Sequence, residues 1–103
     1  MRVAALLERK SAEDRRRFMR HPVNVGAGIC PDSGRPAAPV TVVDLSTHGC
    51  GIEAAGHCEP GSRVWLKLPG LESWPARIVW AEADRAGLSF DRPLHQAVVE
   101  RYA

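Results

Sequence analysis

Apolar and polar side chains alternate along much of this chain with a period of two. Val23, Val25, Ala27 and Ile29 occupy every second position of one segment, an arrangement typical of a strand with one buried face. Further runs of this kind follow, separated by segments rich in Gly, Pro, Asp and Ser, which favour turns. We therefore expect six strands, over residues 23–29, 40–45, 50–54, 64–68, 74–83 and 86–90.

The two ends of the chain have helical rather than alternating spacing. Val3, Leu6 and Leu7 predict a weak amphipathic helix over residues 3–13. Pro93 is suited to the start of a C-terminal helix. The apolar face of that helix would consist of Leu94, Ala97, Val98 and Tyr102. Six short strands with helices only at the ends predict an all-β fold, a small antiparallel barrel.

The size and composition are those of one ordinary globular domain. The chain has 103 residues, of which 45% are apolar and 25% charged, enough for a single domain with a modest core. We expect an N-terminal helix or extension over residues 1–12 and the domain itself over residues 13–103. No apolar run is long enough to cross a membrane, and the first one is too short for a signal peptide, so we expect no membrane insertion.

Positive charge is concentrated at the N-terminal end. Residues 1–21 carry seven Lys/Arg against three Asp/Glu, a balance of +4, whereas residues 22–103 have a balance of −2. Arg15, Arg16 and Arg20 lie in the basic run, and each guanidinium is a planar donor fork suited to phosphates and guanine edges. A basic arm on a mildly acidic body indicates a small anionic ligand.

A short polar turn follows the second expected strand. Asp44, near the end of that strand, can accept hydrogen bonds from guanine N1–H and from the exocyclic amino group, which adenine does not offer together. Ser46 has two interpretations, since its hydroxyl can contact a base or phosphate or can cap the turn. Gly49 would let the backbone approach a ligand and turn with a positive φ. These side chains and the arginines predict one nucleotide pocket.

Both segments resemble the motifs of a known family. Arg16 to Arg20 (RRFMR) matches the RxxxR motif of PilZ domains, and Asp44 to Gly49 (DLSTHG) matches their (D/N)xSxxG motif, in the same order. Trp80 and the segment 87–90 add to this resemblance, which spans residues 13–103. It implies a six-stranded antiparallel PilZ-type β-barrel with a flexible basic N-terminal arm and a short C-terminal helix. It also implies a bacterial receptor for the second messenger cyclic di-GMP.

The resemblance raises two further expectations about the ligand. Arg15 directly precedes the RxxxR motif, and a third arginine there favours two ligand molecules per chain, bound as an intercalated dimer. Trp80 is expected to share a strand face with Ala76 and Ile78. It is then either a residue of the barrel wall or a platform on which a guanine stacks.

The expected mechanism is ordering of the arm over residues 14–21. Ligand phosphates would neutralise the repulsion among its arginines and hold the arm across the barrel, which would alter the interaction with an effector protein. The alternative is a degenerate PilZ domain that binds proteins and no nucleotide. A barrel that binds RNA or single-stranded DNA is less favoured, because the strands have no row of aromatic residues and the body is acidic.

Other kinds of site have little support. Cys30, Cys50 and Cys58 are irregularly spaced, so we expect free thiols and a cytoplasmic location. The spacing of His48, Cys50, His57 and Cys58 is not that of a standard zinc site, and we expect no metal. Because the chain has no nucleophile elbow and no phosphate-binding glycine-rich loop, we do not expect an enzyme.

Overall fold

The computed structural model describes residues 20–31, 37–53 and 58–103. Six strands and a helix lie in these ranges: β1 (His21–Pro31), β2 (Ala38–Leu45), β3 (Gly49–Glu53), β4 (Arg63–Lys67), β5 (Trp74–Glu82), β6 (Arg85–Phe90) and α2 (Gln96–Tyr102). The six predicted strands are therefore confirmed. The helix expected over residues 3–13, most of the basic arm and the boundary at residue 12 lie outside the described residues.

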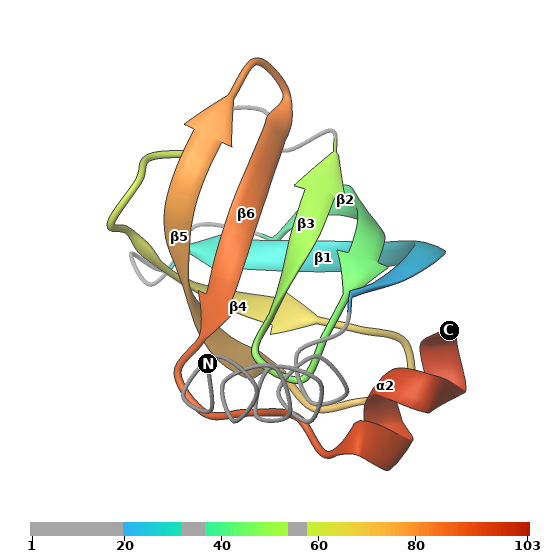
Figure 1. Cartoon of the computed structure of the whole chain (residues 1–103). Helices are drawn as coiled ribbons and strands as arrows, with labels where there is room; N and C mark the ends of the chain where they lie inside the picture. The colour runs from blue at the N-terminus through green and yellow to red at the C-terminus, as the bar shows by residue number, and fades with distance from the viewer. Residues whose placement is uncertain (1–19, 32–36, 54–57) are drawn as a thin grey trace, which may run out of the picture.

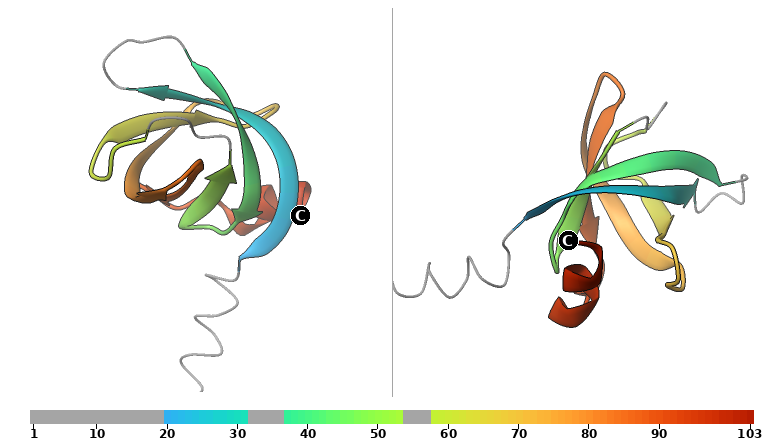
Figure 2. Two further views of the ribbon diagram at one scale, coloured as in Figure 1. Left: turned by 90° about the horizontal axis from the view of Figure 1, so that it is seen from above. Right: turned by 90° about the vertical axis from the view of Figure 1, so that its right-hand side faces the viewer.

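The strands form a closed antiparallel barrel in the order β1-β2-β3-β6-β5-β4 (Figure 1). Closure comes from β1, which pairs antiparallel with β2 on one side and with β4 on the other. The view from above in Figure 2 shows the strands curving around a common interior. The predicted all-β barrel is confirmed, and its closure leaves β1 and β4 without the free edge of an open sheet.

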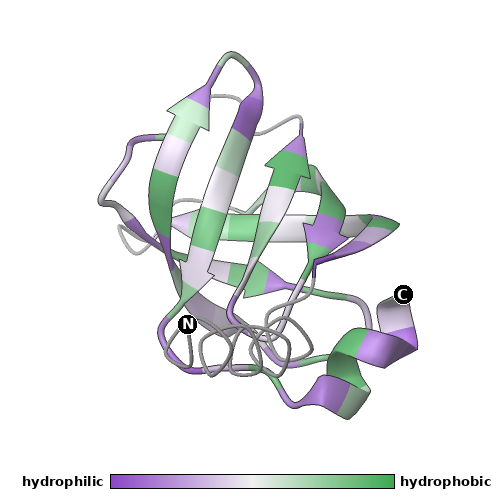
Figure 3. Cartoon of the chain, in the orientation of Figure 1, coloured by the Kyte–Doolittle hydropathy of each residue, from purple (hydrophilic) through white to green (hydrophobic). Residues whose placement is uncertain are grey.

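The barrel interior is filled by every second side chain of the strands. In β1, Ile29 is buried and Val23, Val25 and Ala27 pack partly buried against the core, as the alternation predicts. Apolar and polar positions alternate along the strands in Figure 3. The largest fully buried side chains are Leu45, Ile52, Leu66, Leu68, Leu88, Val42, Val99 and Cys50. Burying one large aliphatic side chain contributes about 1.5–3 kcal/mol.

The alternation fails in β5, where a bulge adds one residue. Ala76 and Ile78 point inward and are buried, but Val79 and Trp80 are 55% and 45% exposed. The pairing with β6 shifts register between Ile78 and Trp80, and Ala81 packs against the core again. The prediction that Trp80 shares a face with Ala76 and Ile78 is therefore wrong, because a bulge places two successive residues on one side.

The C-terminal helix begins later than Pro93 predicts. Its N-cap is His95, whose ring Nδ1 accepts a hydrogen bond from the Ala97 backbone N–H at 3.0 Å. Consequently Val99 is the buried residue of α2, whereas Ala97 is exposed, and the predicted apolar face is wrong at Ala97. Among the described residues, no helix has the length and apolar character needed to cross a membrane.

Helix α2 packs at the end of the barrel opposite the β5–β6 hairpin (Figure 1). Leu94 and Val99 belong to the core, and Val98 packs against it. The Leu94 backbone N–H donates to the Thr47 carbonyl at 2.8 Å, and the Phe90 N–H donates to the His48 carbonyl at 2.8 Å. The segment before α2 therefore fixes the turn between β2 and β3, where one predicted motif lies.

Candidate nucleotide-binding site

One line of paired residues crosses the outer surface of five neighbouring strands. Pro22 pairs with Asp44, Asp44 with Gly51, Gly51 with Gly87, and Gly87 with Trp80. We call these five residues the outer row. Neighbouring strands are ~4.8 Å apart, so the Cα atoms of Asp44 and Trp80 are separated by about 14 Å along the sheet. The register therefore brings Asp44 and Trp80 onto one surface.

The two glycines of the outer row lie beneath the side chains of its polar and aromatic members. A Cβ added to Gly51 would lie 2.4 Å from Asp44 Oδ2, and a Cβ added to Gly87 would lie 2.0 Å from Trp80 Nε1. Both distances are far shorter than a van der Waals contact, so the Asp44 carboxylate and the Trp80 indole can lie against the sheet only because both positions are glycine.

The two predicted motifs meet at Asp44. Arg20 Nη1 donates a hydrogen bond to Asp44 Oδ1, which also accepts from the Gly51 backbone N–H at 3.0 Å. The Arg20 and Asp44 side chains are 55% and 31% exposed. An exposed ion pair of this kind is worth about 0–1 kcal/mol, so a ligand can replace it at little cost. Arg15 and Arg16 lie outside the described residues, and their contribution stays a prediction.

Ser46 caps the turn between β2 and β3. Its hydroxyl donates to the Gly49 carbonyl at 3.2 Å and accepts from the backbone N–H groups of His48 and Gly49, at 3.3 and 3.2 Å. The side chain is buried. Of the two interpretations open from the sequence, the capping role is the one observed, and these contacts fix the turn that directly follows the end of β2, where Asp44 lies.

Gly49 is predicted to have a positive φ and to let the backbone approach a ligand, and the second part stays a prediction. Within the described residues, the glycines with a positive φ are Gly61 and Gly70, so the expected positive φ at Gly49 is wrong. A Cβ on Gly49 would lie 2.2 Å from the Leu88 carbonyl oxygen. The residue is glycine because β3 approaches β6 closely here, a contact between distant segments that the turn sequence alone does not predict.

Trp80 stands beside a hollow at the end of the β5–β6 hairpin. The hollow has a volume of about 340 Å³ and is lined by Trp80, Glu82, Ala83 and Arg85. Trp80 and Val79 are the large apolar side chains most exposed among the described residues. An indole that lies over Gly87 and borders an open hollow is accessible to a planar ligand, whereas a core tryptophan is not.

Cys50 points from β3 into the core, directly behind the site. Burial raises the pKa of the Cys50 thiol to about 12; the nearby Asp44 carboxylate raises it as well, and Arg20 lowers it. The thiol is protonated at neutral pH and packs as a small apolar group. Burial also raises the pKa of Cys58, and no disulfide joins the three cysteines. The described residues contain no group of three metal-ligating side chains, and His57 lies outside them.

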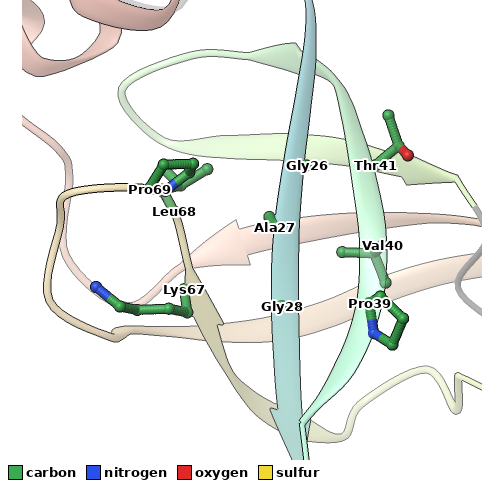
Figure 4. Close-up of a pocket in the computed structure, with 9 residues that line it drawn as sticks. All are labelled: Gly26, Ala27, Gly28, Pro39, Val40, Thr41, Lys67, Leu68 and Pro69. Carbon is green, nitrogen blue, oxygen red and sulfur yellow. The ribbon is translucent and has the colours of Figure 1, made fainter.

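A second hollow, of about 530 Å³, lies over β1, β2 and β4. Figure 4 shows Gly26 and Gly28 at its centre, flanked by Pro39 on β2 and Pro69 after β4, with the Lys67 side chain extending away from β1. None of its lining residues belongs to the outer row. Because its surface is mainly backbone and aliphatic, it has no arrangement of donors that selects an anion.

A family model and a solved structure are similar to this chain. The model of the PilZ domain matches residues 14–102. A solved structure described as the crystal structure of the PilZ domain of CeSA from a cellulose-synthesizing bacterium is similar, with a TM-score of 0.61 and 18% sequence identity. The similarity covers 81% of this chain and 88% of that one, and at this identity it supports the fold alone. None of the curated proteins matches the sequence.

Proposed function

The chain belongs to the PilZ domain family, a family of binding modules, and from this premise we propose that it is a receptor for cyclic di-GMP. The observation that carries the proposal is the contact between Arg20 and Asp44. It joins the last arginine of one motif to the carboxylate of the other, beside Pro22 in the outer row. Cyclic di-GMP has two phosphates and two guanines, so its recognition calls for both kinds of group together.

Each polar side chain has a distinct role in this proposal. Asp44 accepts from the N1–H and amino groups of a guanine, and Arg15, Arg16 and Arg20 donate to phosphates or to guanine O6 and N7. A charge-assisted hydrogen bond contributes about 1.5–3 kcal/mol. Ser46 acts indirectly, because its hydroxyl is already bonded within the turn that positions Asp44.

The distance between Asp44 and Trp80 leaves room for two ligand molecules bound as an intercalated dimer. Stacked bases repeat about every 3.4 Å, so four of them extend about 10 Å, and the distance from Asp44 to Trp80 is about 14 Å. Trp80 offers an exposed indole for stacking, worth about 1–3 kcal/mol per base. Arg15 adds positive charge for a ligand pair that carries four phosphates.

Ligand binding converts this recognition into a signal through the basic arm. The ligand takes over the weak Arg20–Asp44 contact, neutralises the neighbouring arginines and holds residues 14–21 against the barrel. The new surface alters the interaction with an effector protein. Three free thiols support a reducing, cytoplasmic compartment for the receptor.

Isothermal titration of the whole chain with cyclic di-GMP tests the proposal, with cyclic di-AMP and GTP as controls. We expect saturable binding near two ligands per chain with cyclic di-GMP only. Saturation near one ligand per chain would support the receptor function but contradict the role of Arg15 in binding a second ligand molecule. Absence of binding would favour the alternative, a PilZ interaction module without a nucleotide, and competition by an oligonucleotide would favour a nucleic-acid partner.

A further inference from the structure

The β5–β6 hairpin carries charged side chains next to the aromatic end of the outer row. Trp80, Glu82, Ala83 and Arg85 line one hollow of about 340 Å³, and the hairpin projects beyond the neighbouring strands at the top of Figure 1. Glu82 pairs in register with Arg85, and Arg85 with Glu53 on β3. These residues therefore form the next line of the outer surface after the outer row.

We propose that this hollow is a second guanine site, in which the base stacks on Trp80, Arg85 donates to O6 and N7, and Glu82 accepts from N1–H and the amino group. The inference rests on the proposed function, since the base belongs to the same ligand. The family motifs do not include Glu82 or Arg85, so the site extends recognition from β2 across the sheet to β5 and β6.

The combination of an aromatic ring, a guanidinium and a carboxylate matches guanine and disfavours adenine. Arginine makes a bidentate contact with guanine O6 and N7, whereas adenine presents an amino group in place of O6. The Glu82 carboxylate needs donors, and adenine N1 is an acceptor. With adenine in the hollow, the amino group would face the Arg85 donors, and the N1 acceptor would face the Glu82 carboxylate. Neither pair could form a hydrogen bond.

Both charged groups are available to a ligand. Arg85 Nε lies 3.6 Å from Glu53 Oε1, and the two side chains are 57% and 48% exposed. This separation is longer than a hydrogen bond, so the guanidinium is weakly held. None of the ion pairs formed among the described residues includes Glu82.

The turn that closes the hollow holds a strained residue. Ala83 has a φ of 55°, in the left-handed region that costs a residue with a Cβ roughly 1–2 kcal/mol. Glycine would adopt this conformation without strain. A two-residue β-hairpin turn requires a positive φ, so this strain belongs to the turn that joins Glu82 to Arg85 and places both side chains at the hollow.

The distance across the outer row sets the class of ligand. Asp44 and Trp80, which lines the hollow, are about 14 Å apart along the outer row, so one guanine cannot contact both. A ligand with guanines at both ends, or two stacked dinucleotides, can do so. The hollow then distinguishes cyclic di-GMP from a mixed dinucleotide that contains one guanine and one adenine.

Titration of Arg85→Ala in the full chain with cyclic di-GMP tests the second site. We expect the affinity to fall about tenfold, the effect of one charge-assisted contact. Glu53→Gln is the matched control, because it removes the ion-pair partner of Arg85 and keeps the guanidinium; its affinity should be unchanged or higher. Equal losses in the two variants would mean that Arg85 acts only through Glu53, which overturns the proposal.

A second titration compares cyclic di-GMP with 3′,3′-cyclic GMP-AMP in the wild type and in Glu82→Gln. The wild type should prefer cyclic di-GMP, and Glu82→Gln should reduce this preference about tenfold. If Asp44→Ala weakens binding while Arg85→Ala and Glu82→Gln do not, the proposed hairpin site is wrong. The proposed function as a cyclic di-GMP receptor is then still supported. If the wild type binds no cyclic di-GMP, both the proposed receptor function and the proposed hairpin site are wrong.

Discussion

Two pairs of glycines face the outside of this barrel, and they differ in what lies above them. A Cβ on Gly51 or Gly87 would come within 2.4 and 2.0 Å of the side chains of Asp44 and Trp80, respectively. A Cβ on Gly26 would meet nothing within 4 Å, and one on Gly28 would meet only ordinary contacts from 3.8 Å outward. The same residue type therefore gives room to the Asp44 and Trp80 side chains of the candidate site on β3 and β6, and it leaves an open surface on β1.

The difference shows that glycine alone does not identify a site on a strand. What distinguishes Gly51 and Gly87 is the register, which sets each of them beside a polar or aromatic side chain on the next strand.

Replacing Asp44, whose side chain lies over Gly51, should have the largest effect on the affinity for cyclic di-GMP. Asp44→Ala removes the carboxylate proposed to accept hydrogen bonds from guanine and should weaken cyclic di-GMP binding at least about tenfold. Arg16→Ala and Arg20→Ala should have effects of the same order. Titration calorimetry measures the loss, and circular dichroism checks the fold. Asp91→Ala is a suitable control, since Asp91 also pairs with an arginine, Arg63, at 2.8 Å. Normal binding by all three motif variants would overturn the site assignment.

Gly51→Ala should come next, because it moves the Asp44 carboxylate without deleting it. The added methyl group would compete for the space of Oδ2, the movable end of a partly exposed side chain, so the barrel should still fold. Binding should weaken about fivefold to tenfold, while the urea midpoint changes little. In Asp44→Ala, adding Gly51→Ala should cost no further affinity; an additive loss would show that Gly51 acts independently of Asp44.

Gly87→Ala tests the aromatic end of the row. The new Cβ displaces the Trp80 indole, and partial loss of stacking should weaken binding about fivefold. Tryptophan fluorescence should report the displacement before any ligand is added. The double variant Trp80→Ala/Gly87→Ala should bind like Trp80→Ala alone. If the Gly87→Ala protein shows a shifted tryptophan emission spectrum but binds cyclic di-GMP with normal affinity, stacking of the ligand on Trp80 is excluded.

These contacts explain why the sequence predicts the fold better than the site. The alternation identifies six strands, and the two motifs identify Arg20 and Asp44, which do meet. The face of Trp80 is mispredicted because Val79 and Trp80 are both apolar, so hydropathy cannot locate the extra residue of the bulge. The face of α2 is mispredicted because His95 is the N-cap where Pro93 suggests an earlier start.

The roles of the site glycines depend on contacts between distant segments. Gly49 is required by the Leu88 carbonyl oxygen and Gly87 by the Trp80 ring, and each contact follows from pairing in the sheet. A turn motif contains no information on the strand that will lie beside it. A glycine at an outward position inside a strand can indicate that another group lies close to the backbone there. Gly26 shows that such a glycine also occurs where no group lies within 4 Å of the position of its Cβ.

Gly26→Ala should have the smallest effect on binding and the opposite effect on stability. The position is open, and a glycine within a strand is roughly 0.5–1 kcal/mol less stable than alanine, so the free energy of unfolding in urea should rise by about 0.5 kcal/mol. Affinity for cyclic di-GMP should stay within error of the wild type, because Gly26 pairs with Thr41, outside the outer row. A loss of affinity comparable to that of Gly51→Ala would mean that the ligand also covers β1, and the contrast between the two pairs of glycines would then fail.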